Sequence, residues 1–257
     1  MQLELQDKVA VVTGASRGIG RAIAELLSGE GMRLVLAART ADLLEEVAAA
    51  CPGPAAVFPM DLRLEEAPRA LVAFALETYG SVDLLVNNAG ATQRGDFLTL
   101  SEEAWQDGFA LKFFASVRCA REAWPHLMRS RGAVVNIVGI GGRTGTAEFA
   151  IGGAVNAALL NLTKVLADRG VADGVKVNAI NPGSIATDRL KARITKAAQD
   201  GGQSYPEAAA AMARKLGVAR FGRPEEIAAA VAFLASPRSG FCQGAILDLD
   251  GGQTRIL

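Results

Sequence analysis

The strongest constraint on the fold is a regular alternation of two kinds of segment along the whole chain. Short runs rich in β-branched residues favour strands, and longer stretches rich in Ala, Leu and Glu favour helices. The strand-like runs span residues 8–13, 33–38, 55–60, 82–87, 133–138, 175–180 and 245–250. The helical stretches span residues 18–29, 41–50, 63–79, 101–130, 147–170 and 223–235.

This alternation predicts an α/β protein with a parallel sheet that is covered by helices on both faces. No linker rich in Ser, Gly or Pro interrupts the pattern, so residues 1–257 are expected to form a single domain. Half of the residues are hydrophobic and 21% are charged, which is enough apolar material for a substantial core.

The net charge, the first residues and the longest apolar stretch indicate which partners and which cellular location to expect. Lys plus Arg and Asp plus Glu number 27 each, so no net field favours nucleic acid or an anionic membrane. Glu4 and Asp7 precede any apolar run, unlike the start of a signal peptide. The apolar stretch 149–163 is shorter than the roughly 20 residues that span a bilayer, which favours a buried helix. A cytoplasmic protein is expected.

The cysteines and the single histidine argue against metal and disulfide chemistry. Cys51, Cys119 and Cys242 lie far apart in the sequence, and His126 is the only histidine. No metal site is expected, and no Ser-His or Cys-His pair is expected at an active site. Cys119 is interpreted as a packed apolar residue and His126 as a surface residue without a catalytic role.

One segment departs from the alternation. Residues 184–217 separate the sixth strand-like run from the last helix and are polar in the middle, where Gly201 and Gly202 stand. Long insertions after strands of open α/β sheets often cover the ligand crevice. We expect a substrate lid here, with a solvent-exposed helical excursion as the alternative.

The clearest motif is TGASRGIG at residues 13–20, between the first strand-like run and an Ala/Leu helix. Gly14 permits a tight turn, Gly18 lets the backbone approach a pyrophosphate, and Gly20 lets the helix pack on the strand. The helix N-terminus then offers free N–H groups to the phosphates. Because the motif lies in a strand–helix context, it predicts a dinucleotide site in a doubly wound, Rossmann-type fold.

The second strand-like run indicates which dinucleotide binds. Sites for NAD usually have an acidic residue about 20 positions after the glycine loop, whereas this chain has Ala38 followed by Arg39. Arg39 and Arg17 can both reach an adenosine 2′-phosphate through charge-assisted hydrogen bonds. NADP(H) is therefore favoured over NAD(H), the alternative being that Arg39 is a solvated loop residue.

With these and four further segments, the chain resembles the short-chain dehydrogenase/reductase family over nearly its whole length. The segments are MDL at 60–62, NNAG at 87–90, NPGSIAT at 181–187 and DGG at 250–252. The resemblance implies a seven-stranded parallel sheet and a homodimer or homotetramer built through the fourth and fifth helices, with which the largely apolar stretch 154–166 is compatible. The cofactor-binding residues expected from the motifs are Gly14, Ser16, Arg17, Gly18, Ile19, Gly20, Arg39, Asp61, Leu62, Asn88, Ala89, Gly90, Pro182, Gly183, Ile185 and Thr187.

The chain departs from the family at all four catalytic positions. In the family, a Tyr exchanges the hydroxyl proton, a Lys four residues later lowers its pKa, a Ser polarises the carbonyl and an Asn orders a water. Alignment places Gly152 for Tyr, Asn156 for Lys, Gly139 for Ser and Lys112 for Asn. No Tyr occurs from residue 80 to 204, so a small shift of the alignment does not restore one. We expect a pocket enlarged by roughly a Tyr and a Ser.

Lys112 and Asn156 are the remaining catalytic candidates. A buried, unpaired ammonium would cost several kcal/mol, so Lys112 needs a partner. We predict that its Nζ lies within hydrogen-bond distance of Asn156, of a buried carbonyl near residue 139, or of the nicotinamide ribose. The alternatives are a lysine that pairs with a carboxylate of the protein or cofactor and a lysine that points into solvent. Further polar candidates beside the pocket, each of which is otherwise a surface residue, are Gln93, Arg94, Arg143, Thr144 and Glu148.

Three functions remain open from the sequence. The first is an NADP(H)-dependent oxidoreductase that transfers hydride to or from a small carbonyl or alcohol with an atypical proton donor. The second is a catalytically silent NADP(H)-binding sensor or partner subunit, which the loss of four catalytic groups supports. The third is a lyase or isomerase reaction that uses Lys112 or Glu148, because fold alone does not determine chemistry.

Overall fold

The computed structural model describes residues 2–255, whose strands form one parallel sheet. Its order is β3-β2-β1-β4-β5-β6-β7, which confirms the doubly wound, seven-stranded fold. The strands are β1 (Val9–Thr13), β2 (Arg33–Ala38), β3 (Ala55–Pro59), β4 (Leu84–Asn87), β5 (Ala133–Ile137), β6 (Lys176–Pro182) and β7 (Ile246–Leu249).

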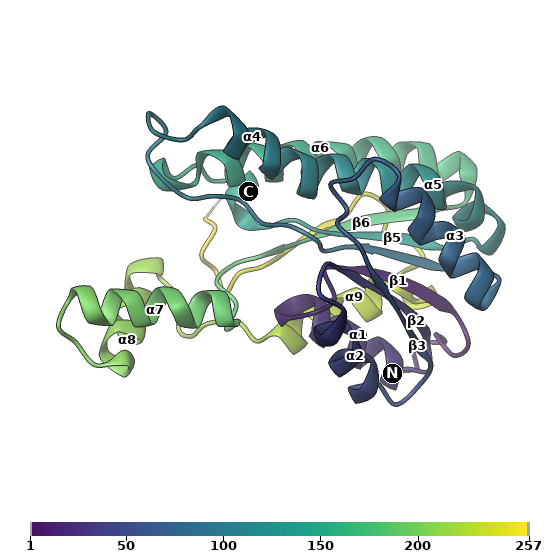
Figure 1. Ribbon diagram of the computed structural model, residues 1–257, viewed down its shortest axis with the longest axis horizontal. Helices are drawn as coiled ribbons and strands as arrows, with labels where there is room; N and C mark the ends of the chain where they lie inside the picture. The colour runs from purple at the N-terminus through teal and green to yellow at the C-terminus, as the bar shows by residue number, and fades with distance from the viewer. Residues whose placement is uncertain (1, 256–257) are drawn as a thin grey trace.

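Helices cover both faces of the sheet (Figure 1). On one face lie α1 (Gly18–Gly29), α2 (Ala41–Ala50) and α9 (Pro224–Ala235). On the other face lie α3 (Ala67–Tyr79), α4 (Glu102–Gly108), α5 (Ala115–Ser130) and α6 (Ala150–Asp173). Central strands are therefore buried on both sides, which explains their continuous apolar runs: Ala10 and Val12 of β1 join one core and Val11 joins the other.

The strand order reverses beside β1, which pairs with β2 on one side and β4 on the other. In open α/β sheets, ligands bind outside the carboxyl ends of the strands at such a switch point. The glycine loop leaves β1 and the NNAG turn leaves β4 at this point. The topology thus brings both predicted motifs to one edge of the sheet.

The helix expected over residues 101–130 is divided in the structure. A π-helical segment, Phe109–Phe114, connects α4 to α5 and contains Lys112. A π-helix has a wider turn than an α-helix and often occurs at functional sites. The helix expected from residue 63 begins later, at Ala67, because Pro68 fits the first turn of a helix, where its missing N–H is not needed.

Residues 184–217 contain two helices, α7 (Asp188–Asp200) and α8 (Tyr205–Leu216). The two helices share a small apolar core formed by Leu190, Ile194, Ala198 and Ala208. Figure 1 shows the pair standing away from the sheet, joined to the body at its two ends. The helices therefore form a compact unit of their own within the single domain.

The apolar stretch at 149–163 belongs to α6, which begins and ends three residues later than the helix expected over residues 147–170. With the turn before it, α6 covers residues 147–173, which is long and apolar enough to span a bilayer by length and composition alone. Ile151, Val155, Leu159 and Thr163 recur at helical spacing and are buried. This spacing places one face of α6 on the sheet, as in an ordinary core helix.

Candidate active site

The glycine loop has the close backbone packing that its sequence predicts. Gly14 and Gly18 adopt φ angles of 65° and 54°, a left-handed conformation that favours glycine. A Cβ on Gly20 would collide with the carbonyl oxygen of Gly14 and lie 2.6 Å from Nδ2 of Asn88. The φ angles of Gly14 and Gly18 and the close contacts at Gly20 therefore favour glycine at these positions.

Thr13 and Asn88 join this loop to the NNAG turn. The Thr13 hydroxyl oxygen accepts hydrogen bonds from the backbone N–H groups of Asn88 and Ala89, each at 3.0 Å. The Asn88 side chain donates to the carbonyl oxygens of Thr13 and Gly14 at 3.0 and 3.1 Å. These bonds hold the two motifs in a fixed relation, although 75 residues separate Thr13 from Asn88.

The N-terminus of α1 is available to an anion. Its N-cap residue, Arg17, makes no side-chain capping bond, and the first turn has no acidic residue. Thr187, which follows β6, lies over the loop: its methyl would be 3.1 Å from a Cβ on Gly18. Free N–H groups and the helix dipole favour a phosphate at this position. The loop and this helix end thus fit the pyrophosphate of a dinucleotide.

The other predicted cofactor residues lie along the same sheet edge. Arg39 follows β2, and both Arg39 and Arg17 are exposed. In the part of the chain that the structure describes, neither arginine takes part in an ion pair. Asp61 accepts hydrogen bonds from Arg63 at 3.2 Å, and the next residue, Leu62, is buried. Arg17, at the start of α1, and Arg39, after β2, therefore remain available to a phosphate.

On the far side of the switch point, β6 ends at Pro182 and packs closely against the end of β7. The N–H of Gly183 donates to the Leu249 carbonyl at 3.1 Å, and a Cβ on Gly183 would be 2.8 Å from Cα of Asp250. Ile185 is buried. This packing positions the segment that leads to Thr187, opposite the glycine loop.

Lys112 makes the contact predicted from the sequence. Its Nζ donates to the Asn156 side-chain oxygen at 2.6 Å and to the Val138 carbonyl at 2.5 Å. Asn156 is only 3% exposed. The aliphatic part of Lys112 crosses Gly90, where a Cβ would lie 2.9 Å from Cδ of the lysine. The amine is thus held at the carboxyl end of β5, between a helix and the NNAG turn.

Burial lowers the pKa of Lys112 from 10.5 to about 7, and the positive charge of Arg189 contributes. An ammonium has three protons, and two of the three are directed to Val138 and Asn156. The third is available to a further acceptor. Near neutral pH this amine can therefore either donate or accept a proton.

Gly139 brings its backbone into the same cluster. Its N–H donates to the Asn181 side chain at 3.2 Å, and its φ of 131° is a conformation that other residues rarely adopt. A Cβ on Gly139 would lie 3.0 Å from Nδ2 of Asn156. A serine at this position would be strained, so the local backbone differs from one that presents a serine hydroxyl.

The pocket is not simply enlarged at Gly152, contrary to expectation. The ring of Phe149 fills the space in which a Cβ of Gly152 would lie, and a Cβ on Gly141 would be 2.7 Å from the same ring. The Arg94 guanidinium stacks over this ring, 4.1 Å from its centroid. The aromatic ring thus occupies part of the volume expected to be open.

Sequence reasoning overlooked Phe149 and Arg189 as parts of the site. Phe149 stands three residues before Gly152, the glycine at the position of the family's Tyr. This aromatic residue close to the substituted position was the signal in the sequence. Arg189 donates to the Gly90 carbonyl at 3.4 Å, two residues beyond the NPGSIAT motif. Of the other polar candidates, Arg143 forms an ion pair of 3.2 Å with Asp248, which accepts a hydrogen bond from the Asn181 side chain.

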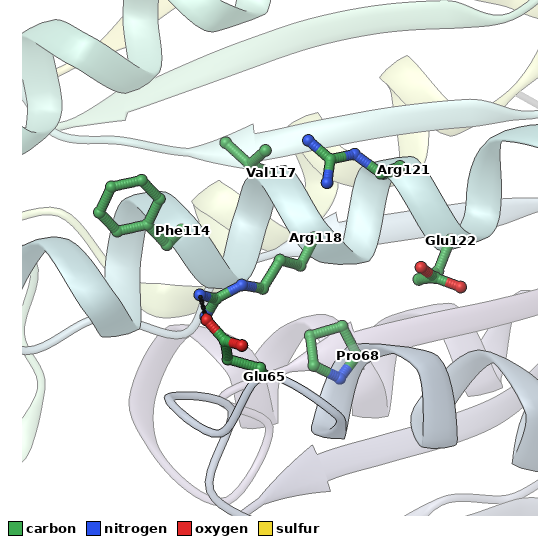
Figure 2. Close-up of a pocket in the computed structure, with 7 residues that line it drawn as sticks. All are labelled: Glu65, Pro68, Phe114, Val117, Arg118, Arg121 and Glu122. Carbon is green, nitrogen blue, oxygen red and sulfur yellow. Dashed lines mark hydrogen bonds and ion pairs between the residues drawn. The ribbon is translucent and has the colours of Figure 1, made fainter.

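Two further features, the Cys119 thiol and a hollow on the surface, do not belong to the candidate site. Burial raises the pKa of the Cys119 thiol to about 12, as expected for a packed, inert cysteine. A surface hollow of about 440 Å³ lies between the start of α3 and α5. Its lining residues are drawn in Figure 2, with the ion pair that joins Arg118 to Glu65. The residues that line this hollow include no predicted site residue. The candidate site is therefore the edge of the sheet between the glycine loop and Lys112.

Fold and site together define a dinucleotide-binding α/β protein, and comparison with known proteins gives its family. The family model described as "Enoyl-(Acyl carrier protein) reductase" matches residues 14–254. Among curated proteins, the chain is 35% identical to short-chain reductase protein NovJ of Streptomyces niveus, over 96% of this chain and 94% of that protein. It is 33% identical to 3-oxoacyl-[acyl-carrier-protein] reductase FabG of Vibrio cholerae, over 99% and 100% of the two chains.

Among solved structures, L-sorbose reductase from Gluconobacter frateurii, in a complex with NADPH and L-sorbose, superposes with a TM-score of 0.95. The two chains are 32% identical, and the match covers 100% of each. The chain belongs to the short-chain dehydrogenase/reductase family.

Proposed function

We propose that this protein is an NADP(H)-dependent oxidoreductase in which Lys112 replaces the proton-donating machinery of its family. The observation that supports the proposal most directly is the amine of Lys112, held by Val138 and Asn156, with a pKa of about 7. A general acid–base group works best when its pKa lies near the operating pH. The substrate is then a small carbonyl compound or the corresponding alcohol.

The pairing of Lys112 with Asn156 supports this proposal. The family resemblance places an Asn on the helix of Lys112 and a Lys on the helix of Asn156, so this chain has exchanged the two residue types. The exchange retains one ammonium and one amide in direct contact, at 2.6 Å. The ammonium thus comes from the segment between α4 and α5, whereas the family's lysine lies on the helix that corresponds to α6.

The cofactor site fits a nicotinamide dinucleotide, which, when bound in reduced form, supplies hydride to the acceptor carbon. The glycine loop and the N-terminus of α1 would hold the pyrophosphate, and Arg17 and Arg39 the 2′-phosphate. Lys112 would orient the substrate oxygen, donate its third proton to that oxygen and regain a proton from water.

We further propose that α7 and α8 act as a lid over this site and that the protein is cytoplasmic.

A catalytically silent NADP(H)-binding protein is the second candidate, and Phe149 supports it. Its ring lies on Gly152, where the family has its Tyr, and Gly139 offers no hydroxyl. One assay separates the two candidates: NADPH binding is established by fluorescence, and absorbance loss is then followed with a panel of ketones, quinones and activated alkenes. Turnover supports the oxidoreductase, and binding without turnover across the panel supports the silent protein.

NADPH is expected to bind at least tenfold more tightly than NADH, a difference of about 1.4 kcal/mol, because the end of β2 carries Arg39 and no carboxylate. Arg39→Ala should remove most of this preference by weakening NADPH about tenfold while leaving NADH nearly unchanged. Fluorescence titration measures both affinities. Arg69→Ala, at an exposed arginine of α3, is the matched control. Equal affinities in the wild-type protein would reject the preference.

We also propose that the protein forms a homodimer or homotetramer through α5 and α6, as its family resemblance implies. Phe114, directly before α5, and Val165 and Val171 of α6 are exposed apolar residues, with Val165 57% exposed. Val165→Glu should therefore shift the protein to a smaller species in size-exclusion chromatography with light scattering. Leu98→Glu, in a loop outside both helices, should leave the mass unchanged. A monomeric wild-type protein would contradict the proposal.

A further inference from the structure

Three arginines converge from two elements on the Lys112 side of the site. Arg94 lies in the loop after β4, and Arg189 and Arg193 lie in the first two turns of α7. We call Arg94, Arg189 and Arg193 the arginine cluster. The elements that carry them leave the carboxyl ends of β4 and β6, where substrates bind in an open α/β sheet.

Contacts connect two members of the arginine cluster, Arg94 and Arg189, to the residues around Lys112. Arg189 donates to the carbonyl of Gly90 at 3.4 Å, and the stem of Lys112 crosses the same glycine. Arg94 stacks on Phe149, whose ring covers Gly152. A backbone hydrogen bond of 3.2 Å from Gly95 to Glu148 fixes this loop against the segment that carries Phe149. The cluster therefore borders the volume in which a substrate would approach Lys112.

The arginine cluster has little internal charge compensation. Burial lowers the pKa of Arg94, as do the positive charges of Arg193 and Arg189, and only Glu148 acts in the opposite direction. Within residues 2–255, none of the three arginines takes part in an ion pair. Like charges four residues apart on a helix, such as those of Arg189 and Arg193, repel each other. An anion between these side chains would relieve the repulsion.

We propose that the arginine cluster binds a carboxylate or phosphate group of the substrate, so that the reaction takes anionic carbonyl compounds or the corresponding alcohols. This inference rests on the proposed oxidoreductase function. Guanidinium groups bind carboxylates and phosphates through paired, charge-assisted hydrogen bonds. The cofactor's phosphates have a separate site, the glycine loop and the end of β2, on the other side of the switch point.

The positive surroundings also suit the chemistry at Lys112. Reduction of a carbonyl places negative charge on its oxygen, and fixed positive charges nearby stabilise that charge. The same charges exclude a cationic acceptor such as an iminium ion. The cluster thus selects the substrate by its anionic group and assists a site that lacks the hydroxyl groups of Ser and Tyr.

The test measures binding, so it needs no knowledge of the natural substrate. The NADP⁺-loaded protein is titrated by calorimetry with succinate and succinamide, and with glycerol phosphate and glycerol. Each anion, or one of the two, should bind at least tenfold more tightly than its neutral partner. The preferred pair then identifies the group as carboxylate or phosphate.

Two variants locate the anion. The double variant Arg94→Gln, Arg193→Gln should weaken the preferred anion at least tenfold and leave NADPH affinity unchanged. Lys191→Gln, at a lysine two residues from Arg189 and on the other side of α7, should bind like the wild type. Circular dichroism and thermal melting verify that each variant is folded.

Three results would overturn the arginine cluster as a substrate site. They are equal binding of charged and neutral probes, binding of neither anion at millimolar concentration, and a parallel loss of NADPH affinity in the double variant. The last would assign the arginines to the cofactor. Anion binding without turnover on a broad panel of keto acids would instead count against the oxidoreductase proposal and leave the anion site in place.

Discussion

Replacing Lys112 with Met is expected to lower turnover at pH 7 by about a hundredfold, because a positioned general acid typically contributes that factor or more. Met retains much of the apolar stem that crosses Gly90 but cannot donate to Val138 or Asn156. Initial rates of NADPH oxidation measure the effect. Lys164→Met is the matched control, since Lys164 also donates to a backbone carbonyl, that of Gly244, outside the site. An unchanged rate in Lys112→Met would leave Lys112 a structural residue.

The role proposed for Lys112 also predicts the direction in which the reaction rate changes with pH. If the ammonium is the acid, the rate of carbonyl reduction should fall as pH rises through about 7, because Lys112 then loses its proton. In the direction of alcohol oxidation the neutral amine acts as base, so the rate should rise through the same pH. Lys112→Arg, which stays protonated, should abolish both inflections. An identical inflection in that variant would assign the titration to another group.

The lowered pKa also predicts a change in stability that needs no substrate. Between about pH 7 and 10.5 the unfolded chain holds the Lys112 proton more tightly than the folded protein. The free energy of unfolding should therefore rise with pH across this range. Denaturant titrations should show a smaller rise in Lys112→Met, because the group that causes it is absent.

Gly20→Ala is expected to weaken NADPH binding about a hundredfold, roughly 2.7 kcal/mol, and to lower the free energy of unfolding. The new methyl would collide with the backbone of Gly14, so the loop has to move from the phosphate position. The matched control is Gly29→Ala, in the same helix, where a Cβ meets nothing within 4 Å. Fluorescence titration and thermal melting measure both effects. A Gly20→Ala protein with wild-type NADPH affinity would contradict the assigned phosphate site.

The fold could be predicted closely because its signals are local. The buried parallel strands appear as β-branched runs, and the predicted helix at residues 18–29 has the same limits as α1. The contact between Lys112 and Asn156 was also predictable, since the family resemblance places both residues on helices that face one pocket. Buried charge then required a partner within reach.

The shape of the pocket could not be predicted in the same way. Whether the Phe149 ring folds onto Gly152 or points away depends on side-chain packing, which the spacing of residues does not encode. The π-helical segment has no Gly or Pro to mark it, so residues 101–130 look like one continuous helix. The sequence does not show that Arg189 and Arg193 lie near the site, because this depends on the position of α7 beside the turn after β4.

The π-helical segment Phe109–Phe114 makes the site sensitive to the length of the chain as well as to its composition. A π-helix advances by more residues per turn than an α-helix, as if one residue had been inserted. Deleting one residue between Phe109 and Lys112 would turn each preceding side chain of α4 by about 100° relative to α5. Such a shortened chain could keep both Lys112 and Asn156, while the side chains of α4 would no longer face the pocket in the same way. The position of the amine therefore depends on the number of residues in this segment as well as on the identity of residue 112.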